Sequence, residues 1–538
     1  MSLLKNVGTI GSLTLVSRVA GMAREMIFSR VLGANAVTDA WFQAFIIPNV
    51  FRRLFAEGAF SAAFVPMFSK RLNGEGGLES ARSFSDDVLS IFLPVLILLC
   101  AVMMLAMPGV IYILADKPVD PVEFDISVAF AQIMFPYILL VSLVTLFTGM
   151  LNSVSRFAPG ASFPIILNIV LIAALLGGEY AAANFGWSVE RVGYVIAWAV
   201  PVAGLLQLVW LYIWTRVEGF RPRLLWPRIT PEVKRLSIIA LPAAIGGGAY
   251  QINTLVQLYF LNQLAEGSVS HMNYADRLNQ LPLGIIGIAL STAILPTLSK
   301  FVGGENREGA DRVQSDAIEL SMLLTIPAAV ALAICATPFI TMIFQGGRFS
   351  MEDATAAGAI LAVLVLGLPA YVLVKVLVPN FYARSDTRTP VYAAFISLVV
   401  FVSACILNNG FALGPVAIDP LGYGVPGIAA ASVIGAWINV GYLYVILVKR
   451  GYYKVPAALL MRVARQLVAA LAMGAALWFA RDLLSGWYSA GLFERLSALL
   501  VLVLCSAVVY FSVAYAVGAI DKQRIAALTR KRAADAKG

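Results

Sequence analysis

Seven basic side chains lie inside or near the ends of long apolar runs, and they are the residues of this sequence best suited to bind an anion. They are Arg18, Arg24, Arg30, Arg52, Arg53, Arg277 and Lys375. A charged side chain at the bilayer centre costs at least about 2.5–3.5 kcal/mol on insertion scales, so each should face a cavity or a charged partner. The planar guanidinium binds phosphate oxygens through two parallel hydrogen bonds. These arginines therefore predict a cationic cavity for an anionic substrate.

Pairing with nearby acids is the alternative explanation of the same arginines. The acids in or beside these runs are Glu25, Asp39, Glu57 and Asp276. Arg53 and Glu57 are four residues apart and can pair on one helix face. Asp39 can pair with Arg24 or Arg30. Because the acids nearly match the arginines in number, internal packing pairs stay open beside the cationic cavity.

Three of the arginines lie at similar membrane depth. Arg18 and Arg24 are in the first apolar run, and Arg52 is near the middle of the second, which crosses in the opposite direction. Once Arg53 pairs with Glu57, no acid stands at helical spacing from Arg52. Arg18 and Arg24 are about 120° apart around an ideal helix. They share one cavity only if the helix bends, which Gly21 would permit.

Other chemistry-bearing residues point to no second site. Arg30, at the end of a run, is typical of an interface residue that extends its charge to water, and Lys375 fits either a cavity or a structural ion pair. His271 is the single histidine, so no His-based triad or metal site can form, and we expect it to be exposed at a helix start. Four cysteines lie far apart in apolar runs and are expected to be small core residues: Cys100, Cys335, Cys405 and Cys505.

The composition is that of an all-α polytopic membrane protein. Hydrophobic residues make up 60% of the 538 residues and charged residues 13%, against about 45–50% and about 25% in soluble proteins. A membrane helix needs about 20 apolar residues, and fourteen runs approach or exceed that length. They are 10–33, 40–68, 88–115, 127–151, 160–178, 193–215, 236–263, 272–299, 318–344, 357–383, 390–408, 425–448, 459–480 and 496–519. This pattern excludes a soluble enzyme with one anchor helix.

The distribution of Lys and Arg predicts the orientation of these runs. If the N-terminus is cytoplasmic, the inside connections hold 27 Lys and Arg and the outside connections hold 5. Such an excess marks the cytoplasmic side. We therefore expect both termini in the cytoplasm, and we interpret the net charge of +9 as loop charge without a role in nucleic-acid binding.

An internal repeat predicts two halves of six helices each. The segment 61–70 (SAAFVPMFSK) matches 291–300 (STAILPTLSK), Phe135-Pro136-Tyr137 matches Leu368-Pro369-Ala370, and Ser155-Arg156 matches Thr387-Arg388, at offsets between 230 and 233. An even number of helices preserves topology, so the halves should be parallel repeats. The predicted divisions are an N-lobe (1–225), a C-lobe (226–452), two further helices (453–520) and a basic cytoplasmic tail (521–538).

Several motifs resemble those of one transporter family. The motifs are Ser17-Arg18-Val-Ala-Gly21-Met-Ala-Arg24, Thr38-Asp39-Ala40, Pro48-Asn49-Val-Phe-Arg52-Arg53-Leu-Phe-Ala-Glu57-Gly58, Phe135-Pro136-Tyr137-Ile138, Tyr274-Ala275-Asp276-Arg277, Phe344-Gln345-Gly346-Gly347-Arg348-Phe349 and Pro379-Asn380-Phe381-Tyr382-Ala383-Arg384. Together they resemble the MurJ (MviN) lipid II flippases of the MOP (MATE-like) exporter superfamily. The resemblance covers residues 1 to about 450 and weakens over the last two helices.

The resemblance implies a V-shaped transporter of two six-helix lobes with two extra helices that form a lipid-facing groove. It implies movement of undecaprenyl-pyrophosphate-linked peptidoglycan precursor from the inner to the outer leaflet by alternating access, in the bacterial inner membrane. Substrate-binding arginines of the family fall on Arg18, Arg24, Arg52 and Arg277. Asp39 matches a gate acid, and Glu25, Arg53, Glu57 and Asp276 are expected in supporting ion pairs. Some members have an acid where this chain has Gln280, so no gate carboxylate is assigned there.

Partners and energy source follow as expectations. Lipid II, membrane lipids and cell-division or peptidoglycan-synthesis proteins are the expected partners. No cofactor and no metal are expected, and the empty carrier would be reset by the membrane potential or by a monovalent ion. The alternatives are a flippase for another polyprenyl-linked glycan of the O-antigen type and a multidrug antiporter of the same superfamily. An antiporter site should be rich in acids, so the sign of the charges argues against it. An enzyme would need paired carboxylates with a metal or a large extramembrane loop, and neither is visible.

Overall fold

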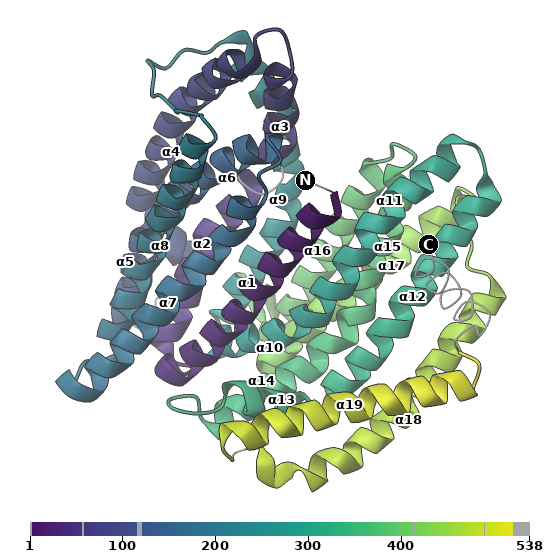
Figure 1. The fold of residues 1–538 in the computed structure, drawn as a ribbon. Helices are drawn as coiled ribbons and strands as arrows, with labels where there is room; N and C mark the ends of the chain where they lie inside the picture. The colour runs from purple at the N-terminus through teal and green to yellow at the C-terminus, as the bar shows by residue number, and fades with distance from the viewer. Residues whose placement is uncertain (1–2, 56–58, 116–120, 414–415, 489, 520–538) are drawn as a thin grey trace. The chain divides into compact units, whose positions relative to one another are not determined.

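A computed structural model describes residues 3–55, 59–115, 121–413, 416–488 and 490–519, and nearly all of them are helical (Figure 1). The expected all-α membrane class is confirmed. Two three-residue strands, β1 (Phe411–Leu413) and β2 (Val416–Ile418), form a small antiparallel pair with Phe411 opposite Ile418. By packing, the chain divides into two units, residues 1–270 with 346–350, and residues 271–345 with 351–538.

The first unit is built from helices of the N-terminal half. They are α1 (Leu3–Leu32), α2 (Ala36–Phe55), α3 (Ala59–Leu72), α4 (Gly77–Ala115), α5 (Pro121–Met134), α6 (Tyr137–Ser153), α7 (Ala158–Phe185), α8 (Val189–Val217) and α9 (Pro231–Leu261). The expected run 127–151 is thus divided between α5 and α6. This division has a local cause: Pro136 has no N–H to donate, and α6 starts immediately after it.

The second unit contains the remaining helices, and α10 begins at the end of the first unit. They are α10 (Ser268–Pro282), the π-helix η1 (Leu283–Gly287), α11 (Ile288–Gly303), α12 (Arg307–Ile334), α13 (Ala336–Phe344), α14 (Met351–Leu364), the 3-10 helix η2 (Val365–Gly367), α15 (Leu368–Tyr382), α16 (Arg388–Asn409), α17 (Gly424–Lys449), α18 (Ala457–Leu483), the 3-10 helix η3 (Ser485–Trp487) and α19 (Leu492–Ala516). Pro369 follows η2 as Pro136 follows α5, so the matched prolines both stand at helix breaks.

Ten helical segments in the described part of the chain are long and apolar enough to cross a membrane. Neither α1 nor α2 is among them. Both carry charges within their length: α1 contains Arg18, Arg24 and Glu25, and α2 contains Asp39, Arg52 and Arg53. The count of fourteen spans stays a prediction.

The turns that follow α6 and α15 have the same geometry and confirm the internal repeat. Ser155 and Ser385, 230 residues apart, have left-handed φ angles of 60° and 59°. The next amides, of Arg156 and Asp386, each donate to the carbonyl five residues earlier at 2.9 Å. This 6→1 bond with a left-handed residue is the Schellman way of ending a helix. The backbone geometry therefore pairs Ser155 with Ser385, two residues before the Thr387 that the sequence match gives.

A second pair of turns follows α8 and α17. Each of these turns forms an ion pair, and the acidic and basic positions are exchanged between the two halves. Gly219 and Gly451, 232 residues apart, have φ angles of 85° and 65°. The residue before each glycine forms an ion pair with the turn just described. Glu218 accepts from Arg156 Nε at 2.8 Å, whereas Arg450 donates to Asp386. The same two positions thus hold opposite charges in the two halves.

Asp386 accepts hydrogen bonds from Thr389 as well as from Arg450. The Thr389 hydroxyl donates to it at 2.6 Å and the Thr389 amide at 3.0 Å. Partial burial by itself would raise the pKa of Asp386, but the hydrogen bonds from Thr389 and Arg450 outweigh that effect. The pKa of Asp386 is therefore held below its usual value, and the carboxylate acts as the cap at the start of α16.

Packing divides the chain at a different point from the predicted boundary near residue 225. Helix α9 follows that boundary but packs against α2, α3 and α4 of the first unit. Its first turn is fixed by Thr230, whose hydroxyl accepts from the Val233 amide at 3.4 Å, with Pro231 at the first helical position. Glu232 then binds Arg71 of α3 at 3.1 Å.

A cluster of phenylalanines forms the core around α3. The Phe64 ring lies 5.4 Å from Phe60 and 5.6 Å from Phe84 between ring centres, and both pairs are stacked. Phe68 meets Phe220 edge-on at 5.5 Å. Such pairs add about 0.5–1.5 kcal/mol beyond the area they bury. They hold the end of α3 and the loop before α9 in one unit.

Candidate functional site

Residues 8–19 of α1 are mostly exposed, whereas residues 24–32 are mostly buried. Arg18 is exposed, whereas Arg24 is only 8% exposed. Helix α1 packs on α7, where the Asn168 amide donates to the Ser17 carbonyl at 3.2 Å. The helix is continuous through Gly21, which faces Asn168. Gly21 therefore stands at a contact with α7, and no helix break marks the bend that a cavity shared by Arg18 and Arg24 would need.

Arg24 is paired with its own neighbour. Its guanidinium donates to the Glu25 carboxylate, and Glu25 is also buried. Glu25 therefore partly neutralises Arg24, and its role in supporting the site stays a prediction. Because a guanidinium carries five N–H donors, one contact with a carboxylate oxygen leaves donors for a second anion.

Arg52 is positioned by the local structure of α2. Its Nε donates to Asn49 Oδ1 at 3.0 Å, and Asn49 in turn donates to the Phe45 carbonyl at 2.9 Å. Pro48, inside this helix, cannot donate the N–H that would normally reach the carbonyl one turn earlier. Arg52 is half-buried and its neighbour Arg53 is exposed. The expected pairing of Arg53 with Glu57 lies outside the described residues.

Tyr137 is a site residue that the sequence reasoning did not single out. It is buried at the first position of α6, and both Arg52 and Arg24 are near enough to interact electrostatically with its phenol. Its hydroxyl lies 3.4 Å from Gln207 Oε1, and Gln207 donates to the Phe163 carbonyl at 3.0 Å. Tyr137, Arg24 and Arg52 thus belong to the same unit. The helix break at Phe135-Pro136 was the signal in the sequence.

Asp39 binds backbone and hydroxyl donors in place of the expected arginines. Its carboxylate accepts from the amides of Gly267 and Ser270, each at 2.8 Å, and from the Ser270 hydroxyl. One turn earlier, the Ala36 amide donates to Glu266 at 2.7 Å. Within the described residues Asp39 forms no ion pair. Its buried carboxylate fixes the start of α2 to the segment before α10, and its gate role stays a prediction.

A glycine-rich segment docks on the end of α1. The Arg348 amide donates to the Arg30 carbonyl at 2.8 Å. Gly33 (φ 79°) touches the Arg348 backbone and Gly347 (φ 56°) touches the Arg30 backbone, so a side chain at either position would meet main-chain atoms. Phe349 is buried. The Phe344–Phe349 motif therefore serves, at least at 346–350, to join this segment to α1.

Arg277 lies on α10 in the second unit and is half-buried. The adjacent Asp276 accepts from Asn279 at 3.3 Å and from Gln280. Gln280, at the position where some relatives have an acid, thus acts as a donor to Asp276. This contact places Asp276 in a polar cluster on its own helix, and its expected role in an ion pair stays a prediction.

The structure also shows the surroundings of His271 and Lys375 in the second unit. His271 was expected to be exposed, which is wrong: its Nε2 lies 2.9 Å from Asp353 Oδ1 and its side chain is 15% exposed. The acidic first turn of α14 supplies this partner. Lys375 is half-buried on α15 and forms no hydrogen bond or ion pair with the residues that the structure describes, so the ion-pair explanation of Lys375 gains no support.

Comparison with known proteins identifies similar chains over nearly the full length. The profile of the family "Lipid II flippase MurJ" matches residues 28–499. A probable lipid II flippase MurJ of Rhizobium meliloti is 42% identical over 522 residues, covering 96% of this chain and 94% of that protein. The lipid II flippase MurJ of Burkholderia cenocepacia is 33% identical and covers 96% of this chain and 98% of its own length.

Solved structures with the same fold fall into two groups. A lipid II flippase MurJ in an inward closed conformation aligns with a TM-score of 0.73 at 23% identity, over 94% of this chain and 97% of that one. An inward-facing multidrug resistance MATE transporter of the MOP superfamily aligns at 0.66 and 14% identity, over 82% and 98%. At these identities the likeness establishes the fold alone.

Proposed function

Because this chain belongs to the lipid II flippase MurJ family, we propose that it moves lipid II from the inner to the outer leaflet by alternating access. The chain is a multi-pass membrane protein of a transporter family. The observation that supports the cationic site is the burial of Arg24 on α1 and the partial burial of Arg52 on α2, in the unit that also buries Tyr137 of α6. These residues come from three helices of one unit.

The chemistry of that arrangement suits a pyrophosphate. Arg24 and Arg52 supply planar donors to phosphate oxygens, whereas the Tyr137 hydroxyl donates its proton to Gln207 and contributes a neutral polar group. The Arg24–Glu25 contact holds the guanidinium in place before substrate arrives. Glu25 neutralises part of the Arg24 charge, and in this proposal Arg24 and Arg52 act together on the anion.

The two parts of the substrate require different surroundings. A polar head needs a cationic, hydrated site, whereas a long apolar tail can remain in lipid. Helices α18 and α19 pack together and expose apolar side chains such as Phe479 (76%) and Val508 (65%). We propose that the tail lies along this surface. An inside-negative potential favours outward movement of the anionic head by about 2.3 kcal/mol per charge per 100 mV.

The same proposal includes the direction of transport and the return of the empty carrier. With both termini cytoplasmic, as the distribution of Lys and Arg indicates, the anion enters from the side of highest positive charge. The empty carrier returns under the membrane potential or with a monovalent ion. Arg18, which is exposed on α1, would meet the head group at an early stage, and Arg277 on α10 stays a proposed substrate-binding residue.

Lipid II translocation in cells depleted of their own flippase tests the proposal. Wild type should restore lipid II in the outer leaflet, and Arg52→Gln should lower the rate at least tenfold while inserting normally. Tyr137→Phe should cause a smaller loss, because it removes one hydroxyl and leaves both arginines. Arg191→Gln, at an exposed arginine of α8, is the matched control and should transport normally.

Two outcomes would overturn the proposal. Normal transport by Arg52→Gln would mean that Arg52 does not bind the substrate. Correct insertion of the wild type without lipid II translocation would move the substrate to another polyprenyl-linked glycan, which the same cells can report when supplied with that lipid.

A further inference from the structure

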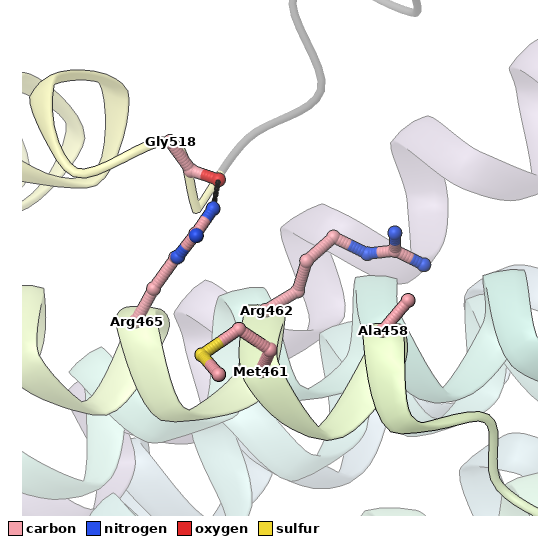
Figure 2. Close-up of a pocket in the computed structure, with 5 residues that line it drawn as sticks. All are labelled: Ala458, Met461, Arg462, Arg465 and Gly518. Atoms are coloured by element: carbon pink, nitrogen blue, oxygen red, sulfur yellow. Dashed lines mark hydrogen bonds between the residues drawn. The ribbon is translucent and has the colours of Figure 1, made fainter.

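An open pocket of about 370 Å³ lies between the first turns of α18 and the end of α19. It is lined by Ala458, Met461, Arg462, Arg465 and Gly518 (Figure 2). The two arginines are three residues apart and so project from neighbouring positions on one side of α18. The pocket belongs to the second unit and is separate from the site around Tyr137.

Each arginine is anchored by one contact that leaves donors available. Arg465 Nη1 donates to the Gly518 carbonyl at 3.3 Å, at the left-handed residue that ends α19 (φ 69°). Arg462 Nε lies 3.1 Å from Glu319 Oε2 of α12. Figure 2 shows both side chains extending from the same side of α18, with the Arg465 guanidinium reaching Gly518. Because each guanidinium has five N–H donors, both retain donors for an anion.

The pocket stands at the boundary of the apolar spans. The span of α18 begins at Ala457 and that of α19 ends at Ala516. Met461 on α18, which lines the pocket, is 57% exposed, and Tyr515 on α19, three residues before Gly518, is 51% exposed. Exposed apolar side chains on membrane helices face lipid, and the ends of spans lie at the level of the headgroups. A molecule held here would place its charge on the arginines and its apolar part along the helices.

We propose that this pocket binds the phosphate of an anionic phospholipid, whose acyl chains lie along α18 and α19. The arginine pair selects a negative charge, and the exposed apolar surface selects a lipid over a free anion. The protein's own following segment does not fit, because residues 520–538 carry six basic and two acidic side chains. The inference goes beyond the transport proposal and does not depend on which lipid is moved.

Lipid binding to the purified full-length chain tests the inference. Native mass spectrometry would follow binding of phosphatidylglycerol, with phosphatidylcholine and inorganic phosphate as separate probes. Phosphatidylglycerol should bind more tightly than phosphatidylcholine. A basic residue near an anionic headgroup contributes roughly 1 kcal/mol, so Arg465→Gln should weaken phosphatidylglycerol about fivefold and leave phosphatidylcholine unchanged. Arg465→Lys should restore part of the preference.

The second arginine needs a compensated variant. Arg462→Gln alone would remove the Arg462 charge from beside the buried carboxylate of Glu319, so Glu319→Gln is added to remove both charges. The affinity of this double variant for phosphatidylglycerol should also fall about fivefold. Arg221→Gln, an exposed arginine of another connection, should bind as wild type does.

Three results would overturn the inference. The first is an unchanged lipid preference in the Arg465 and Arg462 variants. The second is equal binding of inorganic phosphate at the same arginines, which would assign the pocket to a soluble anion. The third is a preference that disappears when residues 520–538 are removed and that the arginine variants do not alter.

Discussion

Replacing Asp39 with Asn tests the link between α2 and the segment before α10. The carboxylate accepts three hydrogen bonds, one from the Gly267 amide and two from Ser270. Asparagine has nearly the same shape but only one accepting oxygen. If that oxygen keeps the two bonds from Ser270, the new NH₂ group faces the Gly267 N–H, and one donor is left without an acceptor.

The free-energy cost follows from these contacts. A buried N–H without an acceptor costs about 1–3 kcal/mol. The two bonds that remain lose the strengthening that a charged acceptor gives. Relief from burying a charge offsets part of this loss. We expect a net local destabilisation of about 2 kcal/mol, which is roughly a 30-fold increase in the opening equilibrium of residues 264–270.

Hydrogen exchange reports this opening directly. Amide exchange of the segment that contains Gly267 and Ser270 should accelerate by roughly 30-fold in Asp39→Asn, while peptides from α6 and α8 keep their rates. Asp125→Asn, at an exposed acid of α5, is the control and should exchange as wild type does. Unchanged protection of Gly267 and Ser270 would refute the reasoning, because it would mean that the carboxylate does not hold this segment.

Three further predictions concern the paired turns and the docked glycine segment. Asp386→Ala should lower the free energy of unfolding by about 1–2 kcal/mol, because it removes a helix cap made with Thr389. Arg156→Ala should lower it by less than about 1 kcal/mol, because the Arg156–Glu218 ion pair is half exposed. Thermal unfolding compares the two variants, and equal losses would contradict the assignment of Asp386 as a cap. Because the pKa of Asp386 is lowered on folding, its stabilisation is complete above the unfolded value of 3.8 and is lost as the pH falls below it. The difference in unfolding temperature between wild type and Asp386→Asn should therefore shrink between about pH 6 and about pH 3, and a constant difference would exclude this titration. Gly347→Ala should release the docked segment, because its left-handed backbone and its contact with the Arg30 main chain leave no room for a methyl group; limited proteolysis at 345–350 should become faster, and unchanged cleavage would contradict the docking.

Helix positions and the repeat were predictable because they depend on local properties. Apolar runs of membrane length must form helices, since no water satisfies the backbone there. The matched prolines at 136 and 369 stand at helix breaks because proline removes a donor wherever it occurs. The Arg24–Glu25 pair was within reach of sequence reasoning for the same reason, since the two residues are adjacent.

Residues that were misjudged or missed have partners far away in the chain. The acceptor role of Asp39 involves Gly267 and Ser270, more than 220 residues later. His271 is covered by Asp353 and not exposed. Neither hydrophobic periodicity nor a sequence motif predicts such a contact, because both describe only the helix on which the residue lies.

The sequence by itself determined the membrane class, the two similar halves and the arginines available to bind an anion, because charge and hydropathy belong to each residue. The tertiary structure decided which of these side chains meet. It joined Asp39 to Gly267 and Ser270 and α9 to the first unit. It also formed equivalent ion pairs in the two halves, with Glu218 in one and Arg450 in the other. A contact between distant helices requires only complementary partners, and many sequences satisfy that requirement, so the pairing becomes visible only when the chain is folded.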